Sequence, residues 1–375
     1  MQNHQAGSIE EYFGELKDPR MDRCKRHQAL DIISITLCAV LCGAEAWTEV
    51  ELFGHSKRSW LATFLELPNG IPSHDTIGRF FSLLDPKSFQ KAFLRWVQSV
   101  SEVIPGQVVA VDGKCLRRSH DRRQDKAAIQ MVSAWASENR MILGQVKTDK
   151  KSNEITAIPE LLQTLQLKGC IVTLDAAGCQ KNIASQIRHQ GADYVLALKG
   201  NQGTLREDVE YFFNTAMKYD FHDIEYDYFE STDGGHGRVE VRRHWVVEAP
   251  DSLSGKAAWR DLNSIGMVES QRHVDGEITT ERRYYISSLE SKAEPFAKTV
   301  RAHWGIENSL HWCLDVGFRE DECRVRTGYA SENFAVIRHI AMNLLKQEKS
   351  CKGGIKSKRL QAGWDNAYLA KLLGV

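Results

Sequence analysis

Three acidic residues stand where their carboxylates could hold a metal ion. Asp112 ends the apolar stretch 107–112, Asp175 ends the apolar stretch 170–175, and Glu307 lies on a long predicted helix. Ionised carboxylates at the ends of buried strands need a cationic partner. Hard divalent cations would meet that need, and Mg²⁺, with Mn²⁺ as its substitute, suits carboxylate and phosphate oxygens. We therefore predict a metal site of these three residues, although an Asp near a glycine also serves as a turn former.

The helix that carries Glu307 also allows a different metal. His303, Glu307 and His311 are spaced four residues apart, so they share one face of an α-helix. Two imidazoles and a carboxylate at this spacing could hold a transition metal, which makes a zinc hydrolase an alternative. The spacing is not that of His-Glu-x-x-His, and no motif for a third ligand stands out. Two histidines that only form hydrogen bonds near an acidic site would explain the pattern as well.

Basic residues follow the acids closely and are candidates for phosphate contacts. They are Lys114, Arg117 and Arg118 after the first acid, and Arg324 and Arg326 after the helix of the last one. Runs of this kind are usually solvated, salt-bridged surface. Their position beside predicted metal ligands favours binding of a DNA backbone, because phosphate contacts come mainly from Arg and Lys.

Two further features could contact DNA. On the predicted strand 238–244, alternation puts Arg238 and Arg242 on one face, which either tracks a DNA backbone or faces solvent. Trp304 and Trp312 flank Glu307 on its helix. An indole can stack on an unpaired base for ~1–3 kcal/mol, although packing in the core is the usual role of tryptophan.

The elements that must position these residues follow from apolar spacing. Residues 8–104 have helical periodicity, and one helix there begins at Ser73 with a polar turn that could meet DNA or simply be capped. Apolar strands alternate with helices from residue 105, and period-two strands fill 222–289. We divide the chain into a helical N-terminal domain (1–104), an α/β core with a mixed sheet (105–221 and 290–347), a β-rich insertion (222–289) and a flexible basic C-terminal tail (348–375).

Composition limits the function further. The 375 residues include 49 Lys plus Arg and 49 Asp plus Glu, so any DNA must be met by local patches and not by a global field. The longest nearly apolar run, 32–44, is shorter than the ~20 residues that span a bilayer. The nine cysteines include no Cys-x-x-Cys pair. We expect a folded cytoplasmic protein without membrane partners.

The motifs, taken together and in order, resemble the DDE transposases of bacterial insertion sequences, and most closely the transposase-like proteins of the H-repeat of Rhs elements. The matching stretches are Ala-Val-Asp-Gly-Lys (110–114), Lys-Ser-Asn-Glu-Ile (151–155), Leu-Asp-Ala-Ala-Gly-Cys-Gln-Lys (174–181), Leu-Lys-Gly-Asn-Gln (198–202), Gly-His-Gly-Arg (235–238) and His-Trp-Gly-Ile-Glu-Asn (303–308). Apart, none of these motifs is specific.

This resemblance implies that residues 1–104 bind DNA and that 105–221 with 290–347 form a ribonuclease H-like catalytic core, in which Asp112, Asp175 and Glu307 are the catalytic triad. Asp112 would bridge two metals about 3.5–4 Å apart, with each of the other acids completing one side. It implies cleavage of double-stranded DNA at the element's terminal repeats and transfer of the 3′-OH to target DNA, by a nucleoid-associated bacterial protein that pairs DNA ends as a possible homodimer. The fourth motif adds Lys199 and Asn201 as DNA-binding residues.

One departure from the family pattern limits the comparison. Related transposases have Tyr, Arg and Lys around the last acid, where this chain has Val300, His303 and Leu314. The phosphate contacts of that Arg and Lys therefore do not carry over. A catalytically silent DNA-binding remnant of an insertion element is the alternative to an active enzyme.

Overall fold

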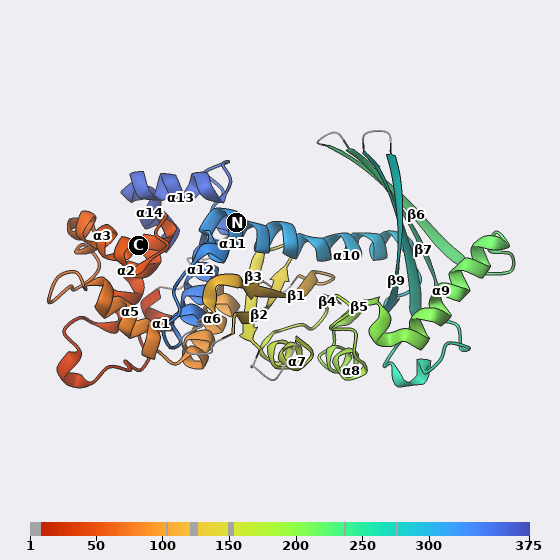
Figure 1. The fold of residues 1–375 in the computed structure, drawn as a ribbon, viewed down its shortest axis with the longest axis horizontal. Helices are drawn as coiled ribbons and strands as arrows, with labels where there is room; N and C mark the ends of the chain where they lie inside the picture. Colours follow the sequence, from red (N-terminus) through yellow and green to blue (C-terminus); the bar gives the residue numbers. More distant parts are fainter. Residues whose placement is uncertain (1–8, 103, 121–126, 149–153, 236–237, 275–276) are drawn as a thin grey trace.

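The sheet that positions the candidate acids extends from the middle of the molecule to the right-hand side of the view, and helices fill the left-hand side (Figure 1). The computed structural model describes residues 9–102, 104–120, 127–148, 154–235, 238–274 and 277–375. Within these residues the strands form a nine-stranded mixed sheet of order β3-β2-β1-β4-β5-β9-β8-β7-β6. The strands are β1 (Val108–Leu116), β2 (Ile129–Ala136), β3 (Met141–Lys147), β4 (Ile171–Leu174), β5 (Asp193–Leu198), β6 (Tyr226–Gly235), β7 (Arg238–Glu248), β8 (Ser264–Val274) and β9 (Glu277–Ser287).

The first half of the sheet combines both strand directions. β1 pairs antiparallel with β2 and parallel with β4, and β4 pairs parallel with β5. Helices α7 (Glu154–Thr164) and α8 (Lys181–His189) lie on the crossovers that parallel strands require. The first four residues of β1, Val108–Val111, are all buried, as expected of a strand covered on both faces. The prediction of a mixed α/β sheet is confirmed.

The segment 222–289 extends the same sheet instead of forming a separate one. β9 pairs antiparallel with β5, and β8, β7 and β6 follow outward as long antiparallel strands. Helix α9 (Gly203–Lys218) packs against β9, and helix α10 (Ala293–Gly305) crosses this region (Figure 1). A Cβ on Gly266 of β8 would lie 2.5 Å from the Phe296 ring, so glycine lets α10 pack closely.

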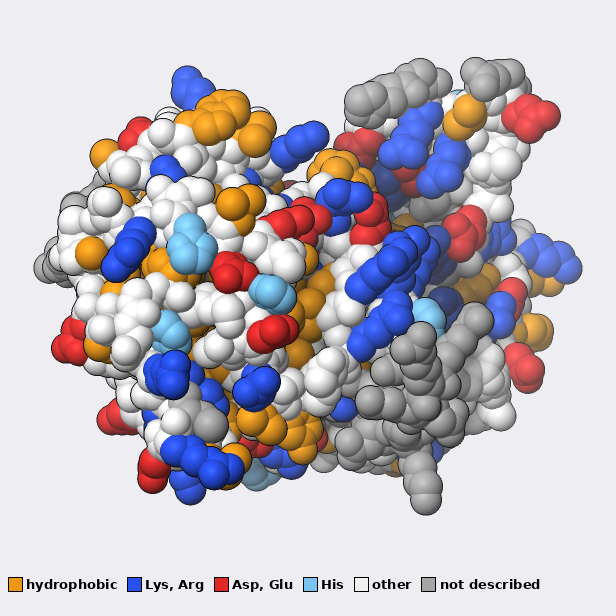
Figure 2. Space-filling view, turned by 60° about the vertical axis from the view of Figure 1, so that its left-hand side comes forward, with side chains coloured by type: hydrophobic (Ala, Val, Ile, Leu, Met, Phe, Trp, Pro, Cys, Tyr) orange, Lys and Arg blue, Asp and Glu red, His pale blue; other side chains and the backbone are white. Residues whose placement is uncertain are grey.

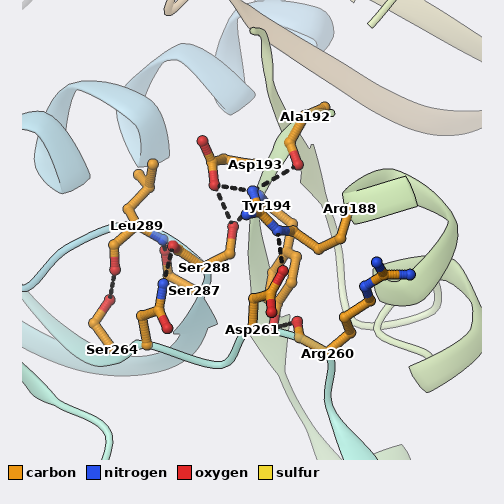
Figure 3. A network of polar contacts seen from close by, with 11 residues as sticks. Arg188, Ala192, Asp193, Tyr194, Arg260, Asp261, Ser264, Ser287, Ser288 and Leu289 are labelled. Carbon is orange, nitrogen blue, oxygen red and sulfur yellow. Dashed lines mark hydrogen bonds and ion pairs between the residues drawn. The ribbon is translucent and has the colours of Figure 1, made fainter. Parts of the chain in front are cut away.

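A polar network ties the outer strands to the core (Figure 3). Nε of Arg188 in α8 donates to Asp261 before β8 at 2.8 Å, and the same guanidinium pairs with Asp193 at the start of β5. The Ser288 hydroxyl after β9 donates to Asp193 at 2.8 Å. These contacts come from three separate parts of the chain, so they fix the junction where β9 joins β5.

The helical part is assembled from both ends of the chain. Its first helices are α1 (Ile9–Phe13), α2 (Ala29–Leu41), α3 (Trp47–Ser56), α4 (Arg58–Leu61), α5 (His74–Leu83) and α6 (Pro86–Val100). Helix α12 (Ala330–Gln347) packs against α2, α5, α6 and β3, and Figure 1 shows it among them. Its residues from Ala330 to Leu345 are all buried. The Ser73 hydroxyl caps α5 by accepting from the Thr76 amide at 3.3 Å.

The expectation of a flexible basic tail is wrong for the described structure. Residues after 348 form α13 (Ile355–Trp364) and α14 (Asn366–Leu373), which pack on the helical part. The Lys358 ammonium donates to the Leu345 carbonyl at 2.8 Å, and Nε of Arg359 donates to the Val40 carbonyl at 3.0 Å. Both cations are buried because backbone carbonyls satisfy their donors.

Among the described residues, no helix has both the length and the apolar character needed to cross a membrane.

Candidate active site

Asp112 and Asp175 lie side by side on neighbouring strands. The parallel pairing of β1 with β4 ends at Val111 opposite Leu174; Asp112 is the next residue of β1, and Asp175 directly follows the end of β4. The prediction that Asp112 ends its strand is wrong, because β1 continues to Leu116 along β2. The Asp175 carboxylate accepts from the Ala177 amide at 2.9 Å, so this residue also shapes the turn after β4.

Glu307 lies in a π-helical turn. The predicted continuous helix consists of α10, a π-helical segment from Ile306 to His311, and α11 (Trp312–Phe318). A π-turn closes hydrogen bonds over five residues instead of four and occurs frequently at functional sites. Ile306 and Leu310 are buried in the core, whereas Glu307 is exposed. The wider turn therefore changes which side chains point in the same direction.

The three acids line one cavity of ≈ 350 Å³. Its lining also includes Thr173 of β4, Lys199 after β5, and His303 and Trp304 of α10. The structure thus brings together residues more than 190 positions apart, as 112 and 307 are. The three carboxylates share the cavity, but among the described residues no group of three His, Cys, Asp or Glu side chains is arranged to hold a metal ion.

The electrostatics of Asp112 favour a cation. Burial, together with the nearby carboxylates of Asp175, Glu154 and Glu307, raises its pKa to about 7, against the opposing effect of a hydrogen bond from the Gly113 amide. Several carboxylates in one poorly hydrated site repel one another unless a cation balances them. The donor set consists of oxygen atoms, which fits a hard divalent ion such as Mg²⁺.

Glu154 is a further acid near the site, outside the residues that line the cavity, and the search for strand-terminal acids missed it. It is the first residue of α7, and burial and Asp175 raise its pKa. A Cβ on Gly113 would lie 1.9 Å from Oε1 of Glu154, so only glycine at 113 leaves room for this carboxylate. The glycine that directly follows Asp112 could have indicated this acid, because a glycine inside a strand often marks a place where another group approaches the backbone closely.

The two histidines contact different strands. Nδ1 of His303 lies 2.9 Å from the Thr173 hydroxyl of β4, and Nδ1 of His311 lies 3.6 Å from Oδ2 of Asp112 on β1. Burial lowers the pKa of both imidazoles to about 4, so both are neutral near pH 7. The common helix face expected for a zinc site is interrupted by the π-turn, and no described trio including Glu307 forms a metal site.

Lys114, predicted to contact DNA, is instead buried in an ion-pair network. Its ammonium pairs with Asp315 of α11 and, at 2.8 Å, with Glu320 of the 3₁₀ turn Glu320–Glu322. Its side chain is only 11% exposed, so it is not available to a phosphate in this structure. Arg117 is exposed, but it pairs with Asp321 at 3.2 Å.

The other predicted DNA contacts lie on the surface. Arg118 and Arg324 are exposed, and Nε of the half-buried Arg326 donates to the Arg118 carbonyl at 2.8 Å. Lys199 is exposed at the mouth of the acidic cavity. The Asn201 amide donates to the Ala176 carbonyl at 2.5 Å, so it supports the turn after Asp175.

A second, larger cavity adjoins the acidic one. This groove of ≈ 830 Å³ lies between β6–β9 and α10, and Glu307, Arg283 and Trp304 line both spaces. Its basic lining residues are Arg238, Arg242, Arg272, Arg283, Lys298 and Arg301, and its acidic ones are Asp233, Glu240, Glu281 and Glu307. Figure 2 shows Lys and Arg side chains beside a hollow near the middle of the view. Arg238 and Arg242 share this face, as the alternation predicted, and Arg242 pairs with Glu240 at 2.6 Å.

The two tryptophans near Glu307 have different surroundings. Trp304 is half-buried, and the Arg283 guanidinium lies 4.6 Å from its ring centroid in a cation–π contact. Trp312 is 60% exposed, which differs from the expectation that a tryptophan packs in the core. Both rings therefore have a surface that a ligand could reach, but only Trp304 lines the cavities.

The sheet, the acidic cavity and the adjoining cationic groove define an α/β protein whose site is suited to a polyanionic substrate. Comparison with known proteins gives the family. Residues 104–344 match the model described as Transposase DDE domain, and residues 10–97 match the model described as DDE_Tnp_1-associated. The chain belongs to the DDE transposase family.

Full-length relatives agree with this assignment. The protein named "Putative transposase YncI" of Escherichia coli O157:H7 is 43% identical over 98% of this chain and 94% of its own length. "H repeat-associated putative transposase YhhI" of Escherichia coli strain K12 is 42% identical over 97% of each chain. The resemblance inferred from the motifs is confirmed.

Proposed function

We propose that this protein is an active DDE transposase, which cleaves DNA at the ends of its element and joins the 3′-OH to target DNA. The observation that carries the proposal is the single cavity lined by Asp112, Asp175 and Glu307 beside a basic groove. The strand order β3-β2-β1-β4-β5, with β2 antiparallel, supports a ribonuclease H-like core around these acids. In both reactions an oxygen nucleophile, water or a 3′-OH, attacks phosphorus and displaces a 3′-oxygen, so the same acids would serve both.

Asp112, Asp175 and Glu307 are the residues that would hold Mg²⁺, or Mn²⁺ in its place. When bound, such ions activate an attacking oxygen and stabilise a leaving oxygen in an in-line displacement. Asp175 is oriented for this by the Ala177 amide. The buried, neutral His303 fills the wall of the cavity and is held by Thr173. The Ala177 amide thus holds the Asp175 side chain, and the contact between His303 and Thr173 fixes the neighbouring wall of the cavity.

The basic groove is the proposed path of the DNA. Arg238 and Arg272 on adjacent strands, and Lys298 and Arg301 on α10, line a channel that ends at Glu307. Phosphate contacts of this kind position a duplex without reading its sequence. The helical part formed by α1–α6 and α12 is the proposed reader of the element's terminal repeats, and two copies on paired ends would form the synaptic complex.

A catalytically silent DNA-binding remnant is the second candidate. The observation that favours it is that the acids share a cavity without forming a three-ligand metal group in the described residues. A remnant would keep the groove and its affinity for DNA but lose phosphodiester chemistry. The two candidates therefore differ in cleavage and agree in binding.

Incubation of the purified protein with labelled DNA that carries its own element's ends would distinguish an active transposase from a silent remnant. The reactions contain Mg²⁺, Mn²⁺, Zn²⁺ or a chelator, and a gel resolves nicked strands. We expect nicking with Mg²⁺ and Mn²⁺ only. The matched control is Asp251→Asn, which removes a fully exposed carboxylate and should cleave like wild type. Binding without cleavage under every condition supports the remnant, and cleavage with Zn²⁺ alone supports the zinc hydrolase.

A further inference from the structure

The strand that carries Asp112 and the helix that follows Glu307 are joined by two consecutive contacts. His311 lies against Asp112, with 3.6 Å between Nδ1 and Oδ2. Two residues further along β1, the Lys114 ammonium pairs with Asp315, which is one helical turn beyond His311. Both pairs join the same strand to the same helix at successive positions, and we call each pair a rung.

The spacing of the two rungs matches on both sides. Side chains two residues apart on a strand point to the same face and are separated by about 6.6 Å along it. Four residues of an α-helix advance about 6 Å. Asp112 can therefore face His311 while Lys114 faces Asp315. Neither the strand nor the helix has to be distorted for this. Any slide of the helix along β1 would break both rungs together.

The second rung is the stronger one, because it is buried and charged. Lys114 also pairs with Glu320 at 2.8 Å, and these two side chains are only 11% and 2% exposed. Glu320 in turn lies 3.7 Å from the Arg338 guanidinium of α12. Buried opposite charges are held in one geometry because separation would leave each without solvation. Lys114 thereby connects β1, α11 and α12 at a point two residues from Asp112.

We propose that Lys114 is a positioning residue, whose ion pairs with Asp315 and Glu320 fix the register of Glu307 relative to Asp112. The proposal rests on the proposed function, since register matters only if the two acids act on the same metal and substrate. Glu307 is four residues before His311 in the same π-turn, so the register of the rungs is also the register of Glu307. Lys114 thus orients the catalytic carboxylates and does not contact DNA.

The test measures binding of Mn²⁺ to the DNA-free protein by the loss of the electron paramagnetic resonance signal of free Mn²⁺. We expect Lys114→Met and Asp315→Asn to weaken Asp112-dependent Mn²⁺ binding by about 10-fold or more, as for other residues that orient metal ligands. Asp315→Glu, which keeps the charge, should restore most of the affinity. Asp315 is 33% exposed, so its variants remain informative if Lys114→Met does not fold.

The matched control is Lys147→Met. Lys147 of β3 pairs with Glu332 of α12, so it is also a strand-to-helix ion pair, but it does not touch the acids. This variant should lower the melting temperature and leave Mn²⁺ affinity unchanged. Wild-type affinity in Asp315→Asn, or an equal loss in Lys147→Met, overturns the positioning role. If the wild type binds no Mn²⁺ through Asp112, the proposed function itself fails, and the positioning role fails with it.

Discussion

Glu154 fills the space above Gly113, so that a Cβ at 113 would lie 1.9 Å from its Oε1. Glu154 thus lies against β1 one residue beyond Asp112, and its carboxylate helps to raise the pKa of Asp112 although it does not line the cavity. The side chain of Glu154 is flexible, so it can move away from an added methyl group at little cost in folding. Gly113→Ala therefore tests the position of this carboxylate and not the stability of the fold.

We predict that Gly113→Ala and Glu154→Gln both raise the Mn²⁺ concentration needed for half-maximal cleavage, by similar factors. Each change removes negative charge from the cation site, one by displacement and one by neutralisation. The control is Gly354→Ala, where a Cβ meets nothing within 4 Å. A titration of cleavage against Mn²⁺ measures the shift. An unchanged midpoint in Glu154→Gln would show that the charge of Glu154 does not contribute to cation binding.

Binding of DNA should depend strongly on salt, despite the zero net charge. The logarithm of the affinity falls against the logarithm of salt concentration with a slope of about −0.9 for each phosphate neutralised. Arg238 and Arg272 are exposed along the groove. Their double replacement by Ala should make the slope shallower by about 2 and leave sequence preference unchanged.

Fluorescence anisotropy at several salt concentrations measures these slopes. Arg260→Ala is the control, because Arg260 is exposed at the connection before β8 and does not line the groove. Equal slopes for the wild type and the groove variant would show that the DNA follows another surface.

Trp304 should stack on a base that unpairs beside the cut. Trp304→Ala would then reduce cleavage of fully paired ends by about 5- to 150-fold, the equivalent of ~1–3 kcal/mol of stacking. Ends with mismatches at the cut should be cleaved with a smaller loss. The measurement compares the two substrates and the melting temperature of the variant.

Trp312→Ala is the matched control for this prediction, since Trp312 is exposed and does not line the cavities. An equal loss on both substrates, with a large fall in melting temperature, would make Trp304 a packing residue that supports Arg283.

Glu348 should stabilise the C-terminal helices in a pH-dependent way. Burial would raise its pKa, but hydrogen bonds from Ser350, the Cys351 amide and Lys371 outweigh burial and lower the pKa from 4.5 to about 2. A lowered folded-state pKa gives stability that is complete above the unfolded value and is lost as pH falls from about 4.5 to about 2. Glu348→Gln should therefore lower the free energy of unfolding at pH 7 by about 3 kcal/mol.

Denaturant unfolding at several pH values measures this difference, which should shrink below pH 4.5. Glu294→Gln is the control, because Glu294 forms an exposed pair with Lys298 on α10. A constant difference between pH 7 and pH 2.5 would contradict the role given to the charge of Glu348.

Much of the architecture could be predicted because the relevant signals are local. Four buried apolar residues in a row identify β1, and alternation along 238–244 correctly places Arg238 and Arg242 on one face. Acids next to apolar strands identified Asp112 and Asp175, since parallel strands align their ends at one edge of a sheet. Order along the chain and periodicity were sufficient for these features.

Other features depend on partners that are distant in sequence. Lys114 meets Asp315 across 201 positions, so its charge alone could not distinguish an internal ion pair from a phosphate contact. From the sequence, Lys358 and Arg359 are expected in a solvated tail. In the structure they are buried, because they donate to the carbonyls of Leu345 and Val40. The sequence around Glu307 has the apolar spacing of an ordinary α-helix, so the π-turn could not be predicted from it. The structure is needed to show that His303 and His311 contact different strands.

The most direct test of the central claim compares cleavage and binding in three single variants, Asp112→Asn, Asp175→Asn and Glu307→Gln. Each keeps the shape of the side chain and removes a charge from the cavity that all three line. We predict that all three lose nicking of labelled element ends in Mg²⁺ while binding the same DNA within a few-fold of wild type, because metal ligation and phosphate contacts belong to different residues. Nicking near the wild-type rate in any one of the variants would contradict the assignment of that residue to the catalytic site.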